Sequence, residues 1–217
     1  MRRTRAIGLG AGGHAGGIIE ILRLDRNLEL VGLLDEDPEL KGRKVHGLTV
    51  LGDDRLLARL TRKGVTHFFV GVGSAGRVVF HRLLYEFALG QGLKPVSAVH
   101  DSAVVSPSAT LGAGIVLMPA AVVNHGASIG DNVIINTGAI VEHDCVIGDH
   151  AHVASGACLA GAVRVGANAH VGAGATVRQG LGIGDRAVVG AGAVVVKNVR
   201  PGAVVVGVPA RERRKRR

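Results

Sequence analysis

The sequence contains no tryptophan and only five aromatic residues, four phenylalanines and one tyrosine, among 217 residues. No apolar run reaches the roughly 18 residues that a membrane-spanning helix needs, so we expect no membrane span. Cysteine is also scarce. Cys145 and Cys158 are the only two, which is too few for a disulfide scaffold and favours a reduced, cytoplasmic chain.

Basic residues outnumber acidic ones by 26 to 17, but the excess lies at the two ends. Arg2, Arg3 and Arg5 begin the chain, and residues 211–217 form a basic tail, while the region between is close to neutral. A nucleic-acid groove needs cations and aromatic rings on a folded face, so we predict no nucleic-acid partner. The tail is a solvated end or a weak binder of anionic membranes or polyphosphates.

Residues 1–97 are predicted to form an α/β domain. Apolar strand patterns alternate with amphipathic helix patterns, which indicates a parallel sheet with packed helices. We expect strands at 6–9, 28–34 and 67–72 and helices at 15–24, 53–62 and 77–89. This length accommodates only half of a doubly wound dinucleotide domain, so the prediction is a Rossmann-like half domain.

Residues 98–200 follow a strict period of six, and residues 201–217 form a C-terminal segment. Every sixth residue is an aliphatic β-former, and four residues after each comes a small or apolar residue, most often alanine. The seventeen aliphatic positions are Val99, Val105, Leu111, Leu117, Val123, Ile129, Ile135, Val141, Ile147, Val153, Leu159, Val165, Val171, Val177, Ile183, Val189 and Val195. Three six-residue repeats form the three sides of one triangular coil, so the pattern predicts a parallel β-helix with aliphatic residues pointing inward.

Two motifs accompany the repeats: Gly10-Ala-Gly-Gly-His14-Ala near the start, and Val141-Glu-His-Asp-Cys-Val-Ile-Gly148 within the repeats. With the closing Val206-Gly-Val-Pro-Ala210, they resemble the bacterial nucleotide-sugar acetyltransferases of the left-handed β-helix, hexapeptide-repeat family. That group includes UDP-4-amino-sugar N-acetyltransferases and sialic acid O-acetyltransferase relatives. The left hand is implied by the resemblance, since the general crossover rule favours the right hand.

The glycine-rich loop follows a strand and opens a helix, an arrangement in which backbone amides approach a phosphate. Asp35 lies at the end of the second predicted strand, where a ribose-binding carboxylate is expected. The alternatives are a tight turn that binds no ligand and a site for NAD. NAD requires a second mononucleotide-binding half, which is missing. The resemblance implies that the nucleotide-sugar is bound by Gly12, Gly13, His14, Asp35, Glu36 and Gly73.

His143 is the candidate general base. It stacks over His125 one coil earlier, Glu142 and Asp144 flank it, and Gly161 lies one coil later, which predicts open space above the ring for a substrate. An amine that attacks a thioester must lose a proton, and a carboxylate-oriented histidine suits that task. The resemblance assigns the orienting carboxylate to Asp144, with Glu142 as the fallback.

The resemblance further implies that acetyl-CoA is the co-substrate and lies beside a neighbouring subunit of a homotrimer, in contact with His152, Ala173 and Ala191. Ala173 and Ala191 stack in one column, and small side chains there would let an extended pantetheine approach the backbone. His152 stacks under His170. No metal is predicted to be required.

The sequence therefore predicts an acetyl-CoA-dependent N-acetyltransferase acting on a nucleotide-linked amino sugar of the UDP-4-amino-4,6-dideoxy type. Acetylation of a sugar hydroxyl, as in the sialic acid relatives, is the alternative. Two further alternatives belong to other classes: a carbonic anhydrase-like trimer and a non-catalytic β-helix trimer. The former needs two histidines five residues apart, and no pair in the sequence has that spacing.

Overall fold

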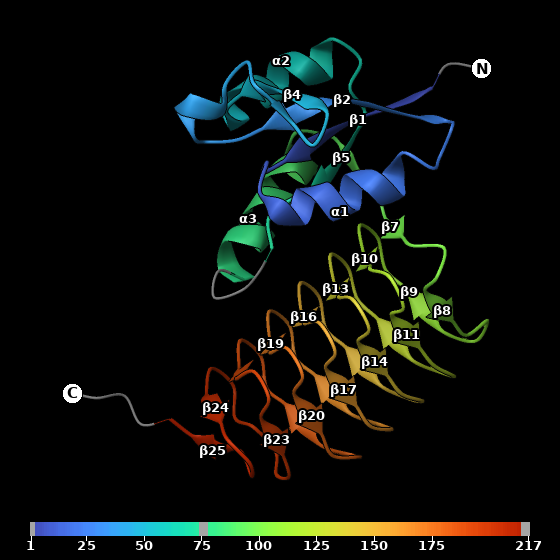
Figure 1. Cartoon of the computed structure of the whole chain (residues 1–217), viewed down its shortest axis with the longest axis vertical. Helices are drawn as coiled ribbons and strands as arrows, with labels where there is room; N and C mark the ends of the chain where they lie inside the picture. The colour runs from blue at the N-terminus through green and yellow to red at the C-terminus, as the bar shows by residue number, and fades with distance from the viewer. Residues whose placement is uncertain (1–2, 74–77, 214–217) are drawn as a thin grey trace. The chain divides into compact units, whose positions relative to one another are not determined.

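The computed structural model describes residues 3–73 and 78–213 (Figure 1). The chain divides into two compact units. One includes residues up to Gly73 together with Val79–Ala98, and the other holds the chain from Val99 onward.

The N-terminal unit is built on a six-stranded sheet in the order β3-β4-β2-β1-β5-β6. Its pairs are parallel except for β3 and β4, which form an antiparallel hairpin. The strands are β1 (Thr4–Leu9), β2 (Leu28–Leu34), β3 (Lys44–Val45), β4 (Leu48–Gly52), β5 (His67–Val70) and β6 (Lys94–Pro95). The helices are α1 (Gly13–Leu22), α2 (Leu57–Arg62) and α3 (Val78–Gly90), and the 3-10 turns are η1 (Pro38–Leu40) and η2 (Asp54–Leu56).

The core of this unit explains why these segments form a sheet covered by helices. Ile7, Leu9 and Phe68 on the central strands are fully buried, as are Ile18 and Ile19 of α1. Burying such side chains contributes about 1.5–3 kcal/mol each. Because β1, β2 and β5 are parallel, the loops that follow them lie at the same edge of the sheet.

Several expected boundaries differ from the structure. The first helix begins at Gly13 rather than Ala15, and the expected strand at 67–72 ends at Val70. Arg77, the first residue of the third expected helix, lies outside the described residues. The hairpin β3–β4 was missed because its two-residue turn contains His46, which adopts a left-handed conformation beside Gly47. Turns with two such residues favour asparagine and glycine, so His46 hides the signal.

The second unit is the predicted parallel β-helix, and it has three sides. Side 1 contains β7 (Ala98–Val99), β10 (Val116–Leu117), β13 (Ile134–Ile135), β16 (His152–Val153), β19 (His170–Val171), β22 (Val188–Val189), β24 (Val204–Val206) and β25 (Arg211–Glu212). Side 2 contains β8 (Val104–Val105), β11 (Val122–Val123), β14 (Ile140–Val141), β17 (Cys158–Leu159), β20 (Thr176–Val177) and β23 (Val194–Val195). Side 3 contains β9 (Thr110–Leu111), β12 (Ser128–Ile129), β15 (Val146–Ile147), β18 (Arg164–Val165) and β21 (Gly182–Ile183).

Successive coils stack with their paired residues three repeats apart, as in the pairing of Ile140 with Cys158 and of Cys158 with Thr176. The period of six predicted through residue 200 fails after Val195, where Ile183 pairs with Val199 and Val188 with Val204. From Leu117 to Val195, every inward aliphatic residue is at most 3% exposed. The expectation that all seventeen point into a filled interior is wrong at the first coil. Val99 and Leu111 there are 40% and 39% exposed, because no coil precedes them.

Corners join the sides, and from Gly114 to Gly192 each corner contains a left-handed residue. At the corner between sides 2 and 3, the left-handed positions in successive coils are Gly126, Asp144, Ala162 and Gly180. At the corner between sides 3 and 1, Asp131 and Asp185 each accept a hydrogen bond from a backbone N–H of the preceding coil, at 2.7 and 3.0 Å. The repeat therefore fixes the place of every corner side chain relative to the coils on either side.

Candidate active site

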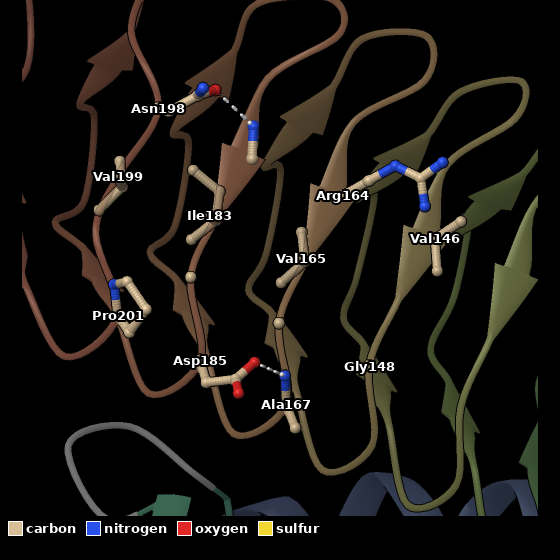
Figure 2. Close-up of a pocket in the computed structure, with 13 residues that line it drawn as sticks. Val146, Gly148, Arg164, Val165, Ala167, Ile183, Asp185, Asn198, Val199 and Pro201 are labelled. Carbon is tan, nitrogen blue, oxygen red and sulfur yellow. Dashed lines mark hydrogen bonds between the residues drawn. The ribbon is translucent and has the colours of Figure 1, made fainter.

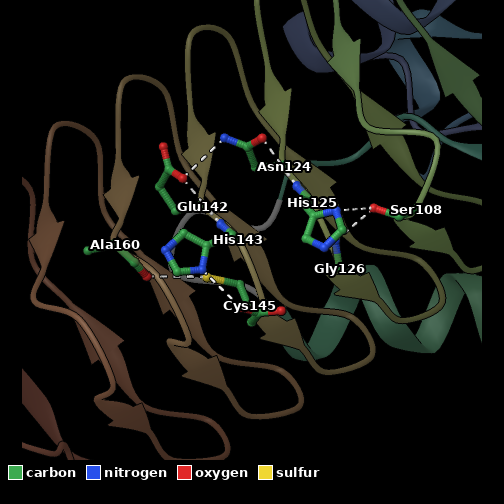
Figure 3. Close-up of polar contacts among 9 residues, drawn as sticks. Ser108, Asn124, His125, Gly126, Glu142, His143, Cys145 and Ala160 are labelled. Carbon is green, nitrogen blue, oxygen red and sulfur yellow. Dashed lines mark hydrogen bonds and ion pairs between the residues drawn. The ribbon is translucent and has the colours of Figure 1, made fainter.

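His143 lies at the corner between sides 2 and 3, two residues after β14 (Figure 3). Its ring Nδ1 donates to Asp144 Oδ2 at 2.9 Å, and the two side chains are 52% and 62% exposed. Glu142 turns away from the ring. Its Oε2 accepts from the backbone N–H of His143 at 3.2 Å and from Asn124 Nδ2 at 3.1 Å. Of the two candidate carboxylates, Asp144 is thus the one that orients the imidazole.

The ring of His143 rests on the backbone of Gly161 in the next coil. A Cβ added at Gly161 would lie 2.5 Å from ring Cε1 and even closer to Nε2. The expectation of open space above the His143 ring, on the side of Gly161, is therefore wrong, because the imidazole itself occupies the room that the missing side chain leaves. Glycine at this position is what allows the ring to adopt its orientation.

Two other groups near His143 are committed to structural contacts. His125, one coil earlier, bonds Ser108 Oγ through Nδ1 at 2.8 Å. The Cys145 thiol donates to the carbonyl oxygen of Ala160 at 3.3 Å, and burial raises its pKa. A buried thiol with a raised pKa is a poor nucleophile, so His143 remains the candidate base at this corner.

His152 and His170 stack on side 1, as their separation by three repeats predicts. The two rings meet edge to face with centroids 4.9 Å apart. Asn136 Nδ2 donates to His152 Nε2 at 3.3 Å, and burial lowers the pKa of His170. Asn136 was not recognised as a site residue from the sequence. It directly precedes Thr137, which lies in the same column as Ala173 and Ala191.

Ala173 and Ala191 are exposed at the corner between sides 1 and 2. His143 is at the other end of side 2, so one chain does not bring these residues together around a single cleft. A full side of the triangle separates them.

In the N-terminal unit, the loop from Gly10 to Gly13 joins β1 to α1. Gly10 is required by the fold, since its φ is +96° and a Cβ there would collide with Val72. Gly12 and Gly13 are different: neither has a positive φ, and a Cβ on either would meet nothing within 4 Å. A Cβ at Gly73 would make only an ordinary contact of 3.7 Å with His14. Packing within the described residues does not require glycine at these three positions, which stay predicted contacts of the nucleotide-sugar.

His14 follows this loop, and its environment favours the neutral ring. Burial, with a smaller effect of His81, lowers the pKa of His14 to about 4. Its Nε2 is buried without a hydrogen-bond partner among the described residues. A neutral ring with such a nitrogen is suited to a hydrogen bond with a ligand.

The two acidic residues after β2 have different surroundings. Asp35 Oδ2 accepts from the backbone N–H of Ala11 at 2.7 Å, and its Oδ1 accepts from that of Asp37 at 3.0 Å. Asp35 therefore holds the glycine loop. Glu36 is exposed, and in the described part of the chain it makes no hydrogen bond or ion pair.

Glu36 lines a pocket of about 470 Å³ that the sequence did not reveal. Its lining comprises Glu36, Asp37, Pro38, Lys41, Gly52, Asp53, Arg55 and Leu56. Beside it, burial raises the pKa of Asp54, and the nearby carboxylates of Asp53, Asp35 and Glu36 add to the shift. Half of the lining residues come from the end of β4 and from η2. These elements are distant in sequence from the glycine loop, so no local sequence motif predicts the pocket.

A groove of about 550 Å³ runs along side 3 (Figure 2). Two of its polar side chains bond within the prism: Asn198 Oδ1 accepts from Gly182 N at 2.9 Å, and Asp185 from Ala167 N. None of the predicted site residues lines it. Across residues 3–73 and 78–213, no three His, Cys, Asp or Glu side chains are arranged to hold a metal ion. No helix in this part of the chain is long and apolar enough to cross a bilayer.

The β-helix, and the corner between its sides 2 and 3 that carries His143, are together typical of the left-handed β-helix acyltransferases. Family models agree with this class along most of the chain. Residues 6–77 match the PglD N-terminal domain, residues 126–161 and 144–179 match the bacterial transferase hexapeptide (six repeats), and residues 162–197 match the hexapeptide repeat of succinyl-transferase.

Solved structures narrow the class. PerB from Caulobacter crescentus, in complex with CoA and GDP-perosamine, is 39% identical with a TM-score of 0.90 over 96% of this chain and 97% of that one. The acetyltransferase domain of PglB from Neisseria gonorrhoeae, in complex with acetyl coenzyme A, is 35% identical with a TM-score of 0.88 over 97% and 100%. WeeI from Acinetobacter baumannii is 26% identical with a TM-score of 0.81 over 97% and 100%. Comparison with curated protein sequences found no match of significance. The chain belongs to the nucleotide-sugar N-acetyltransferases of the left-handed β-helix family, which confirms the resemblance seen in the sequence.

Proposed function

We propose that this protein transfers the acetyl group of acetyl-CoA to the amine of a nucleotide-linked amino sugar. The observation that carries the proposal is the hydrogen bond between His143 Nδ1 and Asp144. It fixes the proton on Nδ1 and leaves the lone pair of Nε2 available as a base.

The reaction is a direct transfer. The amine nitrogen attacks the thioester carbonyl carbon, a C–N bond forms, and the C–S bond breaks. The amine gives its proton to Nε2 of His143, which passes it to the departing CoA sulfur. Asp144 stabilises the imidazolium that forms between these two steps.

The N-terminal unit is assigned to the nucleotide-sugar, bound by Gly12, Gly13, His14, Asp35, Glu36 and Gly73. Open space over Gly12 and Gly13, at the start of α1, supports a diphosphate there. The pocket beside Glu36 is lined by three carboxylates and by the cations Lys41 and Arg55, of which Arg55 bonds Asp53. The exposed carboxylate of Glu36 suits the N–H donors of a nucleobase. Asp35 acts by holding the loop.

The sugar is of the 4-amino-4,6-dideoxy type. PerB was solved with GDP-perosamine, whereas the sequence motifs resemble enzymes that use UDP-linked sugars. Guanine and uracil are therefore the two bases to compare directly.

Acetyl-CoA is assigned to His152, Ala173 and Ala191, with a homotrimer as the working form. The outward-facing residues of side 2 are Val104, Val122, Ile140, Cys158, Thr176 and Val194. All of them except Thr176 are apolar, which supports an interface between copies along this side. A second chain beside side 2 would bring its alanine column to the His143 corner, which one chain alone does not do. Because both cysteines are free, we assign the reaction to the cytoplasm.

The test is thiol release from acetyl-CoA with a panel of GDP- and UDP-linked amino sugars and the matching hydroxy sugars. We expect release with amino sugars, at a rate that falls by about 100-fold or more in His143→Ala. Release with hydroxy sugars alone would replace N-acetylation by O-acetylation. No release with any sugar would refute the proposal.

A further inference from the structure

Two cations, Arg178 and Lys197, lie on the corner that carries His143. The column through His143 contains His125, His143, Gly161 and Gln179, because each strand of side 2 pairs with the strand three repeats later. Lys197 follows the next strand, β23, by two residues, as Gln179 follows β20, in a corner that is two residues shorter because Val199 bridges to Ile183. Arg178 stands beside Gln179 in the same corner. Both Arg178 and Lys197 are exposed, and neither side chain forms a hydrogen bond or ion pair in the described residues.

The charges are distributed unevenly along this corner. Toward the N-terminus from His143 it presents Glu142, Asn124 and Ser108, none of which is a cation. Toward the C-terminus it presents Arg178 and then Lys197. The corner between sides 3 and 1 differs, since its exposed cation, Arg186, stands among Asp131, Asp149 and Asp185. An anionic ligand held at His143 would therefore extend toward the C-terminal coils.

The spacing of the coils provides a ruler. Coils of a β-helix stack about 4.8 Å apart, so Arg178 is about 10 Å and Lys197 about 14 Å along the prism from the level of His143. In acetyl-CoA, 13 bonds join the thioester sulfur to the nearest phosphorus. A fully extended chain advances about 1.2 Å per bond, which places that phosphorus about 15 Å from the sulfur. The distance matches the coil of Lys197, and the long side chain of Arg178 reaches the same level.

We propose that Arg178 and Lys197 bind the phosphates of acetyl-CoA while its thioester lies at His143. This inference rests on the proposed function for the position of the thioester. Guanidinium and ammonium groups are the usual protein ligands of phosphate, and both are available here because no carboxylate of the described residues pairs with them. The diphosphate of the nucleotide-sugar has the same chemistry, so the experiment separates the two sources.

The variants are Lys197→Ala, Arg178→Ala and the double substitution. Arg164→Ala is the matched control: it also removes one exposed cation, but from side 3. CoA affinity is measured by calorimetry without any sugar, and kcat/KM is measured with acetyl-CoA and with S-acetyl-pantetheine, which lacks the phosphates. The KM for the nucleotide-sugar is measured at saturating acetyl-CoA.

We expect each single substitution to weaken CoA binding by about 3–10-fold, the range for one exposed charge-assisted contact, and the double substitution to weaken it further. The value of kcat/KM for S-acetyl-pantetheine and the KM for the sugar should not change, and Arg164→Ala should match the wild type. Unchanged CoA affinity in the double variant overturns the proposal. An equal loss with S-acetyl-pantetheine, or a raised KM for the sugar alone, also overturns it.

Failure of this proposal is distinguishable from failure of the proposed function. CoA binding requires no sugar turnover. A chain that acetylates no sugar, but whose CoA affinity falls in Lys197→Ala and Arg178→Ala, would refute the activity and support the phosphate contacts.

Discussion

Several glycines of the β-helix are packed against the next coil, and the corner glycines that have open space, such as Gly138 and Gly174, have a positive φ, whereas Gly12 and Gly13 of the N-terminal loop have open space without a positive φ. A methyl group added at Gly130, Gly148 or Gly166 would lie 2.9, 2.7 or 2.5 Å from a backbone nitrogen of the next coil. One added at Gly12 or Gly13 would meet nothing within 4 Å. Coil stacking accounts for the first group, so function need not be invoked for it. The second group has no packing cause among the described residues, which agrees with its predicted place at the nucleotide-sugar.

Gly161 has features of both groups of glycines. It lies between coils, yet the atoms that exclude a side chain there are those of the His143 ring. The β-helix thus contains a glycine that leaves room for the ring of the proposed base, His143. The following predictions test this contrast between packing and function.

The largest effect is expected from removing the base. His143→Ala should lower kcat by about 10²–10⁴-fold, the usual contribution of general-base catalysis. The melting temperature should change little, because the ring is half exposed and the interior beneath it is filled by Val141 and Cys145. His125→Ala, one coil earlier, is the control, and steady-state kinetics should find most of its activity retained. Equal kcat in His143→Ala and wild type would remove the base from the mechanism.

Gly161→Ala should lower kcat by about 10–100-fold, since the new methyl group displaces the ring that must accept the proton. Gly182→Ala, in β21 on side 3, is the control, because its Cβ would meet only Asn198 Oδ1, at 3.9 Å. Comparable kcat values for Gly161→Ala and Gly182→Ala would contradict this prediction, because they would mean that the His143 ring can shift without loss of activity.

Asp144→Asn should lower kcat by about 10-fold, because the amide cannot stabilise an imidazolium as a carboxylate does. Glu142→Gln should have a smaller effect, since its amide oxygen can still accept from the backbone of His143 and from Asn124. The kinetic ranking of the two variants identifies the orienting group. The reverse order would assign that role to Glu142.

Gly12→Ala and Gly13→Ala should each raise the KM for the nucleotide-sugar by about 10-fold, through a steric clash with the ligand and not with the protein. The KM for acetyl-CoA and the melting temperature should stay close to wild type. Gly10→Ala, where a Cβ collides with Val72, should instead destabilise the N-terminal unit. An unchanged sugar KM in both loop variants would leave these glycines unexplained.

The smallest effect concerns acid stability. The pKa of His14 is lowered to about 4, compared with 6.5 for an ordinary histidine. Between these values the unfolded chain binds more protons than the folded one, so stability falls as the pH falls from about 6.5 to 4. His14→Asn should make the melting temperature less sensitive to pH in that window by a few degrees. Parallel melting curves for the two proteins would contradict the buried neutral ring.

The β-helix could be predicted from the sequence in unusual detail because its geometry is periodic. A separation of three repeats was enough to place His152 against His170, and the rings do meet. Periodicity does not determine rotamers, however. Nothing in the spacing indicated that the His143 ring would cover Gly161, or that Glu142 would bond the backbone instead of the ring.

The N-terminal unit was less predictable because its site is assembled from loops. The motif located Asp35 correctly at the end of β2, but not the two backbone amides that occupy its oxygens. The pocket beside Glu36 depends on Lys41, Asp53 and Arg55, which approach only after the hairpin β3–β4 folds back. Such tertiary placement leaves no local pattern in the sequence.

The most direct test of the central claim is the mass of the sugar product formed by the full-length protein with acetyl-CoA and GDP-perosamine or its UDP-linked 4-amino counterpart. The account predicts that the nucleotide-sugar gains one acetyl group on its amine, in an amount equal to the thiol released, and that His143→Ala forms this product about 100-fold more slowly or slower still. An unmodified sugar, or a product formed equally fast by the variant, would contradict it.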